Sequence, residues 1–278
     1  MRILVARKHE HGRRPLKDVA TEADYDELIT EPTKVVDEDG SPIVVYDRID
    51  RDYGPLLRAL RRMRYSTTNR TQKIDSRGAD DPNQTSRVFG YRPRRTGRQD
   101  WCRAVRLAYE DPRSHAQLVA WADYLTELFE RHSPERWARH KELMSDVLDC
   151  WRMGDSVFTS GIANRSNPMP YHFDAGNFSG SWSGMLGFQR DMGGGDLVLP
   201  DYRLAFRQEG GRATLFDGQG VLHGITHFNR RSRLSYRYTV VYYSMRLMKH
   251  CGTPEEELAR VQKVKTQREI RRATKDHR

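Results

Sequence analysis

The chain has 278 residues, of which 37% are hydrophobic and 31% charged, and its formal net charge is +10. This length can bury one sizeable core, whereas no apolar run approaches the roughly 20 residues that a membrane span requires. The first residues show neither the apolar stretch nor the small-residue cleavage site of a secretory signal. A basic surface of this size favours polyanionic partners, because each phosphate neutralised by Lys or Arg releases counterions.

Three cysteines, Cys102, Cys150 and Cys251, lie far apart and include no CxxC pair. An odd, scattered set is not typical of a disulfide framework and suits a reducing cytoplasm. We therefore expect a cytoplasmic protein whose cysteines behave as small buried hydrophobic side chains.

The first third of the chain shows little periodicity. Residues 1 to 50 read as a polar lead-in with short strands, the clearest being 41–46, where β-favouring residues follow a turn signal. Residues 53–65 predict a short basic helix, because four apolar residues recur at helical spacing. Residues 66–85 are rich in Ser, Thr, Asn, Asp and Gly and predict a loop.

Two longer helices follow. Residues 114–131 place Leu118, Trp121 and Leu125 on one apolar face, as an amphipathic helix requires. The next helix begins with Ser133 as N-cap and Pro134 at the first helical position. These aromatic and apolar side chains are predicted to form core.

From residue 156 short β-rich runs alternate with Gly and Pro, which favours a sandwich or jelly roll. The runs are 157–159, 185–188, 197–200, 213–216 and 238–243. From Thr253 onward the sequence predicts a capped helix with a basic end. We expect one α+β domain with a mainly helical part (1–155), a β core carrying the chemistry (156–245), and a C-terminal helix with a basic tail (246–278).

The segment Tyr171-His-Phe-Asp contains an HxD pair. In an extended backbone residues i and i+2 point to the same side, so His172 and Asp174 can reach one ion. A distant second imidazole would complete the two-histidine, one-carboxylate triad of non-haem iron oxygenases. His223, 49 residues after Asp174, is preferred over His227 because an apolar residue and Gly224 flank it. The alternative is a structural histidine and a solvated aspartate.

An oxoacid cosubstrate requires a fixed cation for its distal carboxylate, and Arg offers a bidentate fork. Arg237 directly precedes the apolar run 238–243, so that its side chain can point inward, and Thr239 shares its face. Arg233 has the same spacing to Ser235 and is the second candidate. Either arginine could instead be a surface charge.

Six strings, in this order, resemble the TET/JBP group of nucleic-acid-modifying dioxygenases, especially its bacteriophage members. They are Thr159-Ser-Gly-Ile-Ala-Asn-Arg, Pro170-Tyr-His-Phe-Asp-Ala-Gly-Asn, Gly194-Gly-Asp-Leu-Val-Leu-Pro, Leu215-Phe-Asp-Gly, Leu222-His-Gly-Ile-Thr and Arg237-Tyr-Thr-Val-Val-Tyr-Tyr. The similarity covers residues 155 to 245 and extends loosely to Arg87-Val-Phe-Gly-Tyr-Arg-Pro-Arg. The first 80 residues and the basic tail match no family known to us.

The resemblance implies a double-stranded β-helix that oxidises the methyl group of 5-methylpyrimidines in DNA. It makes His172, Asp174 and His223 the Fe(II) ligands and Arg237 the 2-oxoglutarate-binding residue, with O2 as co-reactant. A bacteriophage origin would place the protein in the host cytoplasm. The chain lacks the cysteine-rich, zinc-binding region of animal TET proteins, so DNA docking would use other surfaces, such as the Arg-rich clusters.

A base methyl inside duplex DNA cannot reach a pocket within a barrel, so the nucleotide is expected to flip out. Asn177 is the candidate for its Watson–Crick edge. The stacking candidates are Tyr171, Phe173, Phe178 and Trp182. Each has a structural alternative, since Asn177 could cap a turn and the rings could pack the barrel. Arg92, Arg94 and Arg95 could bind phosphates or approach the cosubstrate.

The leading hypothesis is a hydroxylase that converts 5-methylcytosine in DNA to 5-hydroxymethylcytosine. Thymine is the alternative base. A 2-oxoglutarate dioxygenase acting on a protein or a small molecule would leave the charge of +10 without a role. A non-catalytic barrel that binds nucleic acid would make His172 and Asp174 structural. The sequence does not distinguish oligomeric states.

Overall fold

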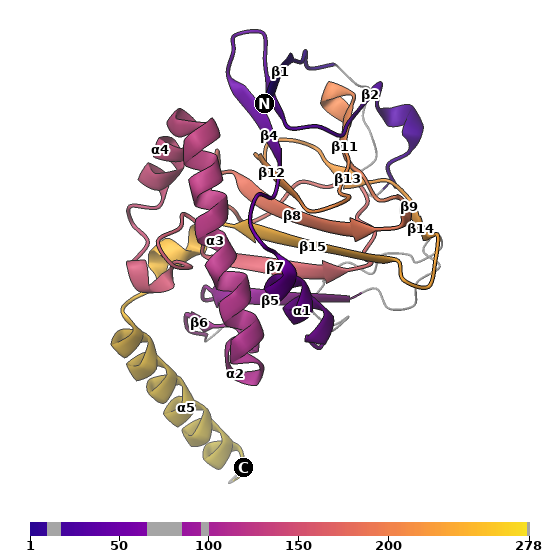
Figure 1. Ribbon diagram of the computed structural model, residues 1–278. Coiled ribbons are helices and arrows are strands. Elements are labelled where there is room, and N and C mark those ends of the chain that lie inside the picture. The colour runs from indigo at the N-terminus through magenta and orange to yellow at the C-terminus, as the bar shows by residue number, and fades with distance from the viewer. Residues whose placement is uncertain (10–17, 66–84, 96–99, 277–278) are drawn as a thin grey trace.

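The computed structural model describes residues 1–9, 18–65, 85–95 and 100–276. Figure 1 shows a body of strands with helices along one side and a long C-terminal helix. The helices are α1 (Gly54–Arg62), α2 (Leu107–Glu110), α3 (Pro112–His132), α4 (Pro134–Leu143) and α5 (Pro254–Asp276), with short 3-10 turns at Glu22–Asp24, Asp149–Trp151, Pro200–Tyr202 and Arg246–His250.

The larger sheet has nine strands in the order β1-β3-β4-β12-β8-β15-β7-β5-β6. β1 pairs with β3 in parallel, and the other neighbours are antiparallel. The strands are β1 (Arg2–Val5), β3 (Thr33–Val36), β4 (Pro42–Arg48), β12 (Arg212–Phe216), β8 (Ser183–Arg190), β15 (Tyr236–Tyr243), β7 (Ser160–Arg165), β5 (Thr85–Arg92) and β6 (Arg103–Ala104).

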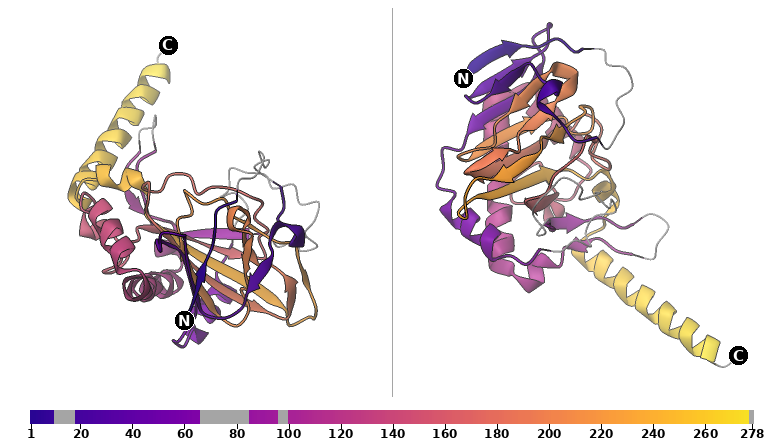
Figure 2. Two further views of the ribbon diagram at one scale, coloured as in Figure 1. Left: turned by 90° about the horizontal axis from the view of Figure 1, so that it is seen from above. Right: turned by 90° about the vertical axis from the view of Figure 1, so that its right-hand side faces the viewer.

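A smaller sheet has the order β13-β10-β11-β2, and β14 pairs with β9. These strands are β13 (Gly224–Ile225), β10 (Leu197–Leu199), β11 (Leu204–Phe206), β2 (Glu27–Ile29), β14 (Phe228–Arg230) and β9 (Met192–Gly194). Apolar side chains of both sheets, among them Tyr46 and Leu199, share one buried cluster, so the sheets pack face to face (Figure 2). The expected α+β class with a jelly-roll, double-stranded β-helix core is confirmed.

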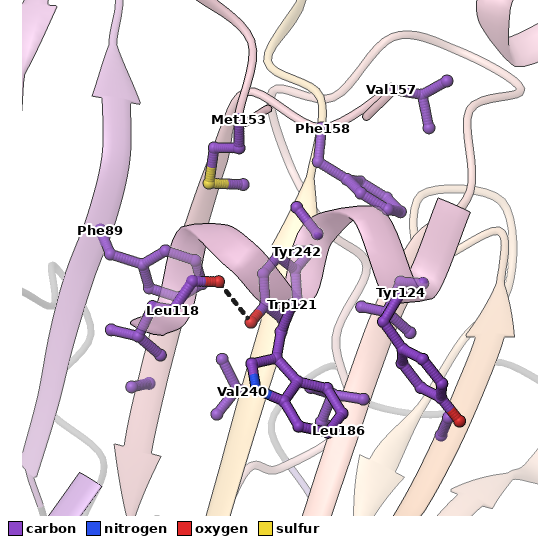
Figure 3. Close-up of a cluster of buried hydrophobic side chains, with 14 of the residues drawn as sticks. Phe89, Leu118, Trp121, Tyr124, Met153, Val157, Phe158, Leu186, Val240 and Tyr242 are labelled. Carbon is purple, nitrogen blue, oxygen red and sulfur yellow. Dashed lines mark hydrogen bonds between the residues drawn. The ribbon is translucent and has the colours of Figure 1, made fainter. Parts of the chain in front are cut away.

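The other face of the large sheet is covered by helices. Alternation along β15 puts Tyr238, Val240 and Tyr242 into the cluster that α1 and α3 cover. Figure 3 shows this layer, where the Tyr242 hydroxyl donates to Leu118 O at 2.9 Å. Burial of each such large apolar side chain contributes roughly 1.5–3 kcal/mol, and it fixes which face of β15 points the other way, between the sheets.

The periodic helices lie where their spacing predicts them, as α1, α3, α4 and α5. Two details differ. Ser133 occupies the N-cap position of α4, but its side chain makes no capping bond and its buried Oγ has no partner among the described residues. The run 157–159 is not a strand, since β7 begins at Ser160. The predicted loop at 66–85 lies outside the described residues apart from Thr85, which begins β5.

Residues 1–155, which we expected to be mainly helical, contribute strands as well as helices. Strands β1, β3, β4, β5 and β6 come from this part and join the large sheet on both sides of the β core. Short strands with mixed burial lack the strict alternation that makes a strand visible in sequence. The boundary at residue 155 therefore does not separate helices from strands, and both parts share one sheet.

The expectation that the three cysteines behave as small buried hydrophobic side chains is wrong. Cys102 and Cys251 form a disulfide with a Cα–Cα distance of 5.7 Å, and Cys150 is free and exposed. The two partners are 149 residues apart, so only the fold brings them together. The bridge joins the β6 region to the segment before α5, which extends away from the body (Figures 1 and 2). Within the described residues, no helix is both long and apolar enough to cross a membrane.

Candidate metal centre

Two segments far apart in sequence lie side by side at the centre. His172 and His223 form an isolated antiparallel bridge, in which His172 N donates to His223 O at 2.9 Å and His223 N donates to His172 O at 3.2 Å. The ring centroids are 4.2 Å apart. Asp174 projects to the same place, since one ligand atom from each of the three residues lies within 4.8 Å of the other two.

The two imidazoles are held in the same tautomer. Nδ1 of His172 is 2.8 Å from Pro170 O, and Nδ1 of His223 is 2.9 Å from Val221 O. A carbonyl oxygen only accepts, so each Nδ1 donates and each neutral ring presents the lone pair of Nε2. Those Nε2 atoms lie 3.7 Å and 3.9 Å from Asp174 Oδ1. The two Nε2 atoms and one carboxylate oxygen, which are the atoms that could bind a metal ion, thus lie close together.

The carboxylate of Asp174 is positioned from two sides. Its other oxygen, Oδ2, accepts from Ser183 Oγ at 3.0 Å, and Ser183 Oγ accepts from Asn177 Nδ2 at 3.3 Å. Asp174 N donates to Gly218 O at 2.8 Å. A Cβ atom at Gly218 would come within 2.3 Å of Asp174 Oδ2, so a side chain at this position would displace the carboxylate.

His172, Asp174 and His223 line a cavity of about 90 Å³ between the two sheets. Its wall is mostly apolar, with Thr239, Val241 and Tyr243 of β15 along one side. The other lining residues are Ile162, Asn164, Asn167, Met169, Met185, Leu197, Phe216 and Ile225. An apolar wall keeps water from the reacting atoms and strengthens the electrostatic contacts of the few polar groups.

Arg237 lies two residues before Thr239 on the same face of β15 and is 1% exposed. Its Nη2 donates to Gly195 O at 3.2 Å, and its guanidinium lies 4.9 Å from the centroid of the Phe228 ring. Burial lowers the pKa of Arg237 to about 10, whereas the charge of Asp196 acts in the opposite direction. Its Nε has no hydrogen-bond partner among the described residues. A buried cation with an unused donor is suited to an anionic ligand.

The second candidates lie elsewhere. His227 is exposed and does not belong to the group of three ligand atoms. Arg233 is exposed in the turn before β15. The geometry therefore favours His223 and Arg237 over these alternatives.

The predicted base contacts are not gathered in the cavity. Tyr171 packs with Ala20 and Leu222, and its hydroxyl donates to Asp24 at 3.0 Å. Asn177 is buried and supports Ser183, as described above. Phe173, by contrast, is 44% exposed.

The other two rings belong to the core that the helices cover. Trp182 stacks on Phe129 with centroids 5.2 Å apart, and Phe178 packs in the same cluster.

Three lining residues, Asn164, Asn167 and Tyr243, were not predicted from the sequence to have a role in the site. Asn167 Nδ2 donates to Asn164 Oδ1 at 3.1 Å, and Asn164 Nδ2 donates to Thr239 Oγ1 at 3.4 Å. Tyr243 lies at the far end of the cavity face of β15. Alternation from Arg237 would have identified Tyr243, because every second residue of the strand shares the face.

A jelly roll with two imidazoles and one carboxylate between its sheets defines the class of non-haem iron oxygenases, in which three protein ligands leave coordination positions open. The residues fit Fe(II), because two imidazole nitrogens and one carboxylate oxygen are the ligands of this class. The bonds from each Nδ1 to a backbone carbonyl leave each Nε2 lone pair available to the metal ion. They also fit 2-oxoglutarate, because Arg237 offers an unpaired, buried donor.

The comparisons agree with this class. Residues 86–246 match the Tet_JBP family model, described as the oxygenase domain of the 2OGFeDO superfamily, the 2-oxoglutarate- and Fe(II)-dependent dioxygenases. The chain therefore belongs to the Tet_JBP family.

Two curated relatives are named thymine dioxygenases, JBP1-B and JBP1-A, of Trypanosoma cruzi (strain CL Brener). They are 26% and 25% identical to the chain over 108 residues. Each match covers 39% of this chain and 13% of the relative.

A solved structure described as NgTET1 in complex with 5mC DNA has a similar fold. It matches with a TM-score of 0.59 and 14% identity, over 85% of this chain and 90% of that chain. At this identity the likeness concerns the fold, and it covers more of the chain than the family model does.

Proposed function

We propose that the chain is an Fe(II)- and 2-oxoglutarate-dependent dioxygenase that hydroxylates the methyl group of 5-methylcytosine in DNA. The observation that carries the proposal is the convergence of His172, Asp174 and His223 at one cavity. The buried Arg237 lies two residues before the lining residue Thr239, on the same face of β15. Bound Fe(II) and 2-oxoglutarate supply an oxidant from O2, with succinate and CO2 as the other products. The chain itself positions the reactants and excludes water.

In this proposal His172, Asp174 and His223 hold Fe(II), and Arg237 with Thr239 binds the distal carboxylate of 2-oxoglutarate. Arg237 reaches this role because β15 places it and Thr239 on the face between the sheets. Asn164 orients the Thr239 hydroxyl through its amide at 3.4 Å. Ser183 and Asn177 keep the carboxylate of Asp174 turned toward the two imidazoles.

DNA is the proposed substrate because the fold matches that of a structure described as a complex with 5mC DNA, and because the chain carries a net charge of +10. The cavity lies between the two sheets, where a base paired within a duplex cannot reach, so the nucleotide has to flip, at a cost of a few kcal/mol. Phe173, exposed next to two ligands, and Tyr243, which lines the cavity, offer rings against which the flipped base can stack.

Thymine is the second candidate base, because both Trypanosoma cruzi relatives are named thymine dioxygenases. It carries the same methyl position as 5-methylcytosine, so the same cavity would serve. A 2-oxoglutarate dioxygenase acting on a protein or a small molecule is the remaining alternative.

Nucleoside mass spectrometry tests the proposal. Protein loaded with Fe(II) and 2-oxoglutarate is incubated with matched duplexes that contain cytosine or 5-methylcytosine at the same positions. We expect 5-hydroxymethylcytosine from the methylated duplex alone. Hydroxymethyluracil from both duplexes would identify thymine instead, and succinate release without any oxidised base would reject DNA as the substrate.

The matched variants are His172→Ala and Asp174→Ala. We expect each to lower turnover by at least about 100-fold, because removing a ligand costs more than removing a group that supports one. Thermal unfolding of the metal-free proteins should remain close to that of the wild type. Full activity in either variant would end the metal assignment.

A further inference from the structure

A second cavity, of about 420 Å³, adjoins the metal pocket. Tyr243 lines both cavities and so forms a wall between them. Met245 also lines the second cavity, and its backbone is bridged to that of Asn177, next to the ligand loop. The opposite side is lined by Arg92, at the end of β5, and by Arg94 and Arg95, which follow it.

The arginines around this cavity outnumber the carboxylates that pair with them. Arg94 forms an ion pair with Glu257 of α5, whose carboxylate also accepts from Cys102 N and Gly252 N. Arg95 and Arg103 both pair with Asp100. Three arginines thus share two acidic groups. Arg92 is a fourth, and the described residues provide no ion pair for it.

The position of Arg92 makes its positive charge costly. It lies opposite Arg103 in the register of β5 and β6, and it is half-buried. Burial lowers the pKa of Arg92, and the charges of Arg103 and Arg95 act in the same direction, opposed by Asp100. That carboxylate is already bonded to the two other arginines. An anion bound beside Arg92 would offset this repulsion.

We propose that the second cavity binds a phosphodiester group of the DNA strand, next to the nucleotide whose base enters the metal pocket. The proposal rests on the proposed function for its choice of polymer. A flipped nucleotide stays attached to its neighbouring phosphates, so a cation separated from the base pocket by the Tyr243 wall lies where the backbone has to pass. Guanidinium binds phosphate through two parallel N–H bonds, which makes Arg92 the main contact.

DNA binding by the metal-free protein tests the proposal without turnover. The affinity for a duplex with one 5-methylcytosine is measured by fluorescence anisotropy across a salt series, for the wild type, Arg92→Gln and Arg139→Gln. Arg139 is the charge-matched control, since it is exposed on α4 and the described residues give it no ion pair. We expect Arg92→Gln to weaken binding about 5- to 10-fold and to reduce the salt slope by about 1, and Arg139→Gln to change neither.

Arg92→Lys keeps the charge and should restore the slope while recovering only part of the affinity. A duplex with uncharged methylphosphonates on both sides of the methylated nucleotide locates the contact. The wild type should lose affinity for it, whereas Arg92→Gln should bind it about as tightly as it binds the all-phosphodiester duplex. Equal losses in both proteins would place the phosphate contact elsewhere and overturn the proposal. Comparable thermal unfolding of all variants ensures that binding is compared between folded proteins.

Two further results would overturn the phosphate site. Arg92→Gln could bind DNA as Arg139→Gln does. Alternatively, it could leave DNA binding unchanged while raising the 2-oxoglutarate concentration that half-saturates succinate release, which would assign the cavity to the cosubstrate. Failure of the proposed function is distinguishable, because it appears as the absence of any oxidised base whatever the binding data show.

Discussion

Arg237 is completely buried, and the residues that the structure describes give it no ion pair. Asp196 acts on it electrostatically, but that carboxylate pairs with Arg207 at 2.9 Å. Gly195, at φ +81°, leaves the space that the guanidinium needs, because a Cβ there would come within 2.8 Å of Arg237 Nε. The guanidinium is therefore already held in one position without a bound anion.

The first prediction separates Arg237 from Arg233. Arg237→Ala should raise the 2-oxoglutarate concentration for half-maximal succinate release by about 100-fold or more, since breaking a buried charge pair costs several kcal/mol. Arg233→Ala, on the exposed turn, should change it less than about twofold. Steady-state kinetics at saturating DNA measure both. The reverse ranking would move the carboxylate-binding role to Arg233.

His140 shows how a buried imidazole can be fully bonded while neutral. Its Nδ1 accepts from Trp182 N at 3.4 Å, and its Nε2 lies 2.8 Å from Ser244 Oγ, which itself donates to Val157 O at 2.6 Å. Ser244 directly follows β15, so this histidine ties α4 to the end of the strand that lines the cavity. Protonation would add a donor where a backbone N–H already points.

The second prediction follows from that neutrality. Burial lowers the pKa of His140 from 6.5 to about 3. Below pH 6.5 the imidazole is protonated in the unfolded chain but not in the folded chain. The contribution of His140 to the free energy of unfolding is therefore fully present above pH 6.5 and is lost as the pH falls toward 3.

The free energy of unfolding in urea should fall by roughly 1 kcal/mol per pH unit more steeply in the wild type than in His140→Asn. The exposed His250→Asn serves as the control and should keep the wild-type slope. Parallel slopes in wild type and His140→Asn would show that the histidine is charged in the folded protein.

At the scale of elements, the turn between β12 and His223 decides whether three ligands meet. Asp217 starts it by accepting from Gln219 N and Gly220 N, and Gly218 then passes directly against the carboxylate of Asp174. The chain next reaches the antiparallel bridge between His223 and His172. A side chain at Gly218 would therefore act on the Asp174 carboxylate rather than on the core.

The third prediction concerns this turn. Gly218→Ala places a methyl group 2.3 Å from Asp174 Oδ2, so the carboxylate has to turn away. We expect the affinity for Fe(II), measured anaerobically by calorimetry, to fall by about 10- to 100-fold. Gly220→Ala is the control, because it is exposed in the same turn and the atoms nearest to its Cβ belong to Asp217 rather than to Asp174. Unchanged affinity in Gly218→Ala would show that Asp174 is not a ligand in this orientation.

At the scale of the whole molecule, the Cys102–Cys251 disulfide and Glu257 hold α5 to the edge of the large sheet. Glu257 is 2% exposed, and the helix beyond it leads away from the body (Figure 1). The bridge closes a loop that contains the entire β core. In the chain-entropy model such a long loop gives a disulfide its largest effect on the unfolded state.

The fourth prediction counts thiols. Unreduced protein in denaturant should titrate one thiol, that of Cys150, and reduction should raise the number to three. Cys102→Ser together with Cys251→Ser should lower the free energy of unfolding by about 2–4 kcal/mol. Three titratable thiols before reduction would show that the bridge does not form in solution. The sequence-based prediction, in which the cysteines are unpaired, would then hold.

What the sequence alone determined is local or periodic. The helices α1, α3, α4 and α5 follow from apolar spacing, and the pairing of His172 with Asp174 follows from two residues on one face of an extended segment. Alternation along β15 likewise puts Arg237 and Thr239 together. These features depend on neighbours within a few residues, so the chain order itself encodes them.

The tertiary structure decided everything that joins distant segments. It bridged the backbones of His172 and His223, paired Cys102 with Cys251, and placed the Tyr171 hydroxyl against Asp24 rather than in the cavity. It also recruited the N-terminal strands into the sheet. Each of these outcomes depends on which surfaces come into contact when the two sheets pack together. The spacing of residues along the chain does not predict such contacts between distant segments.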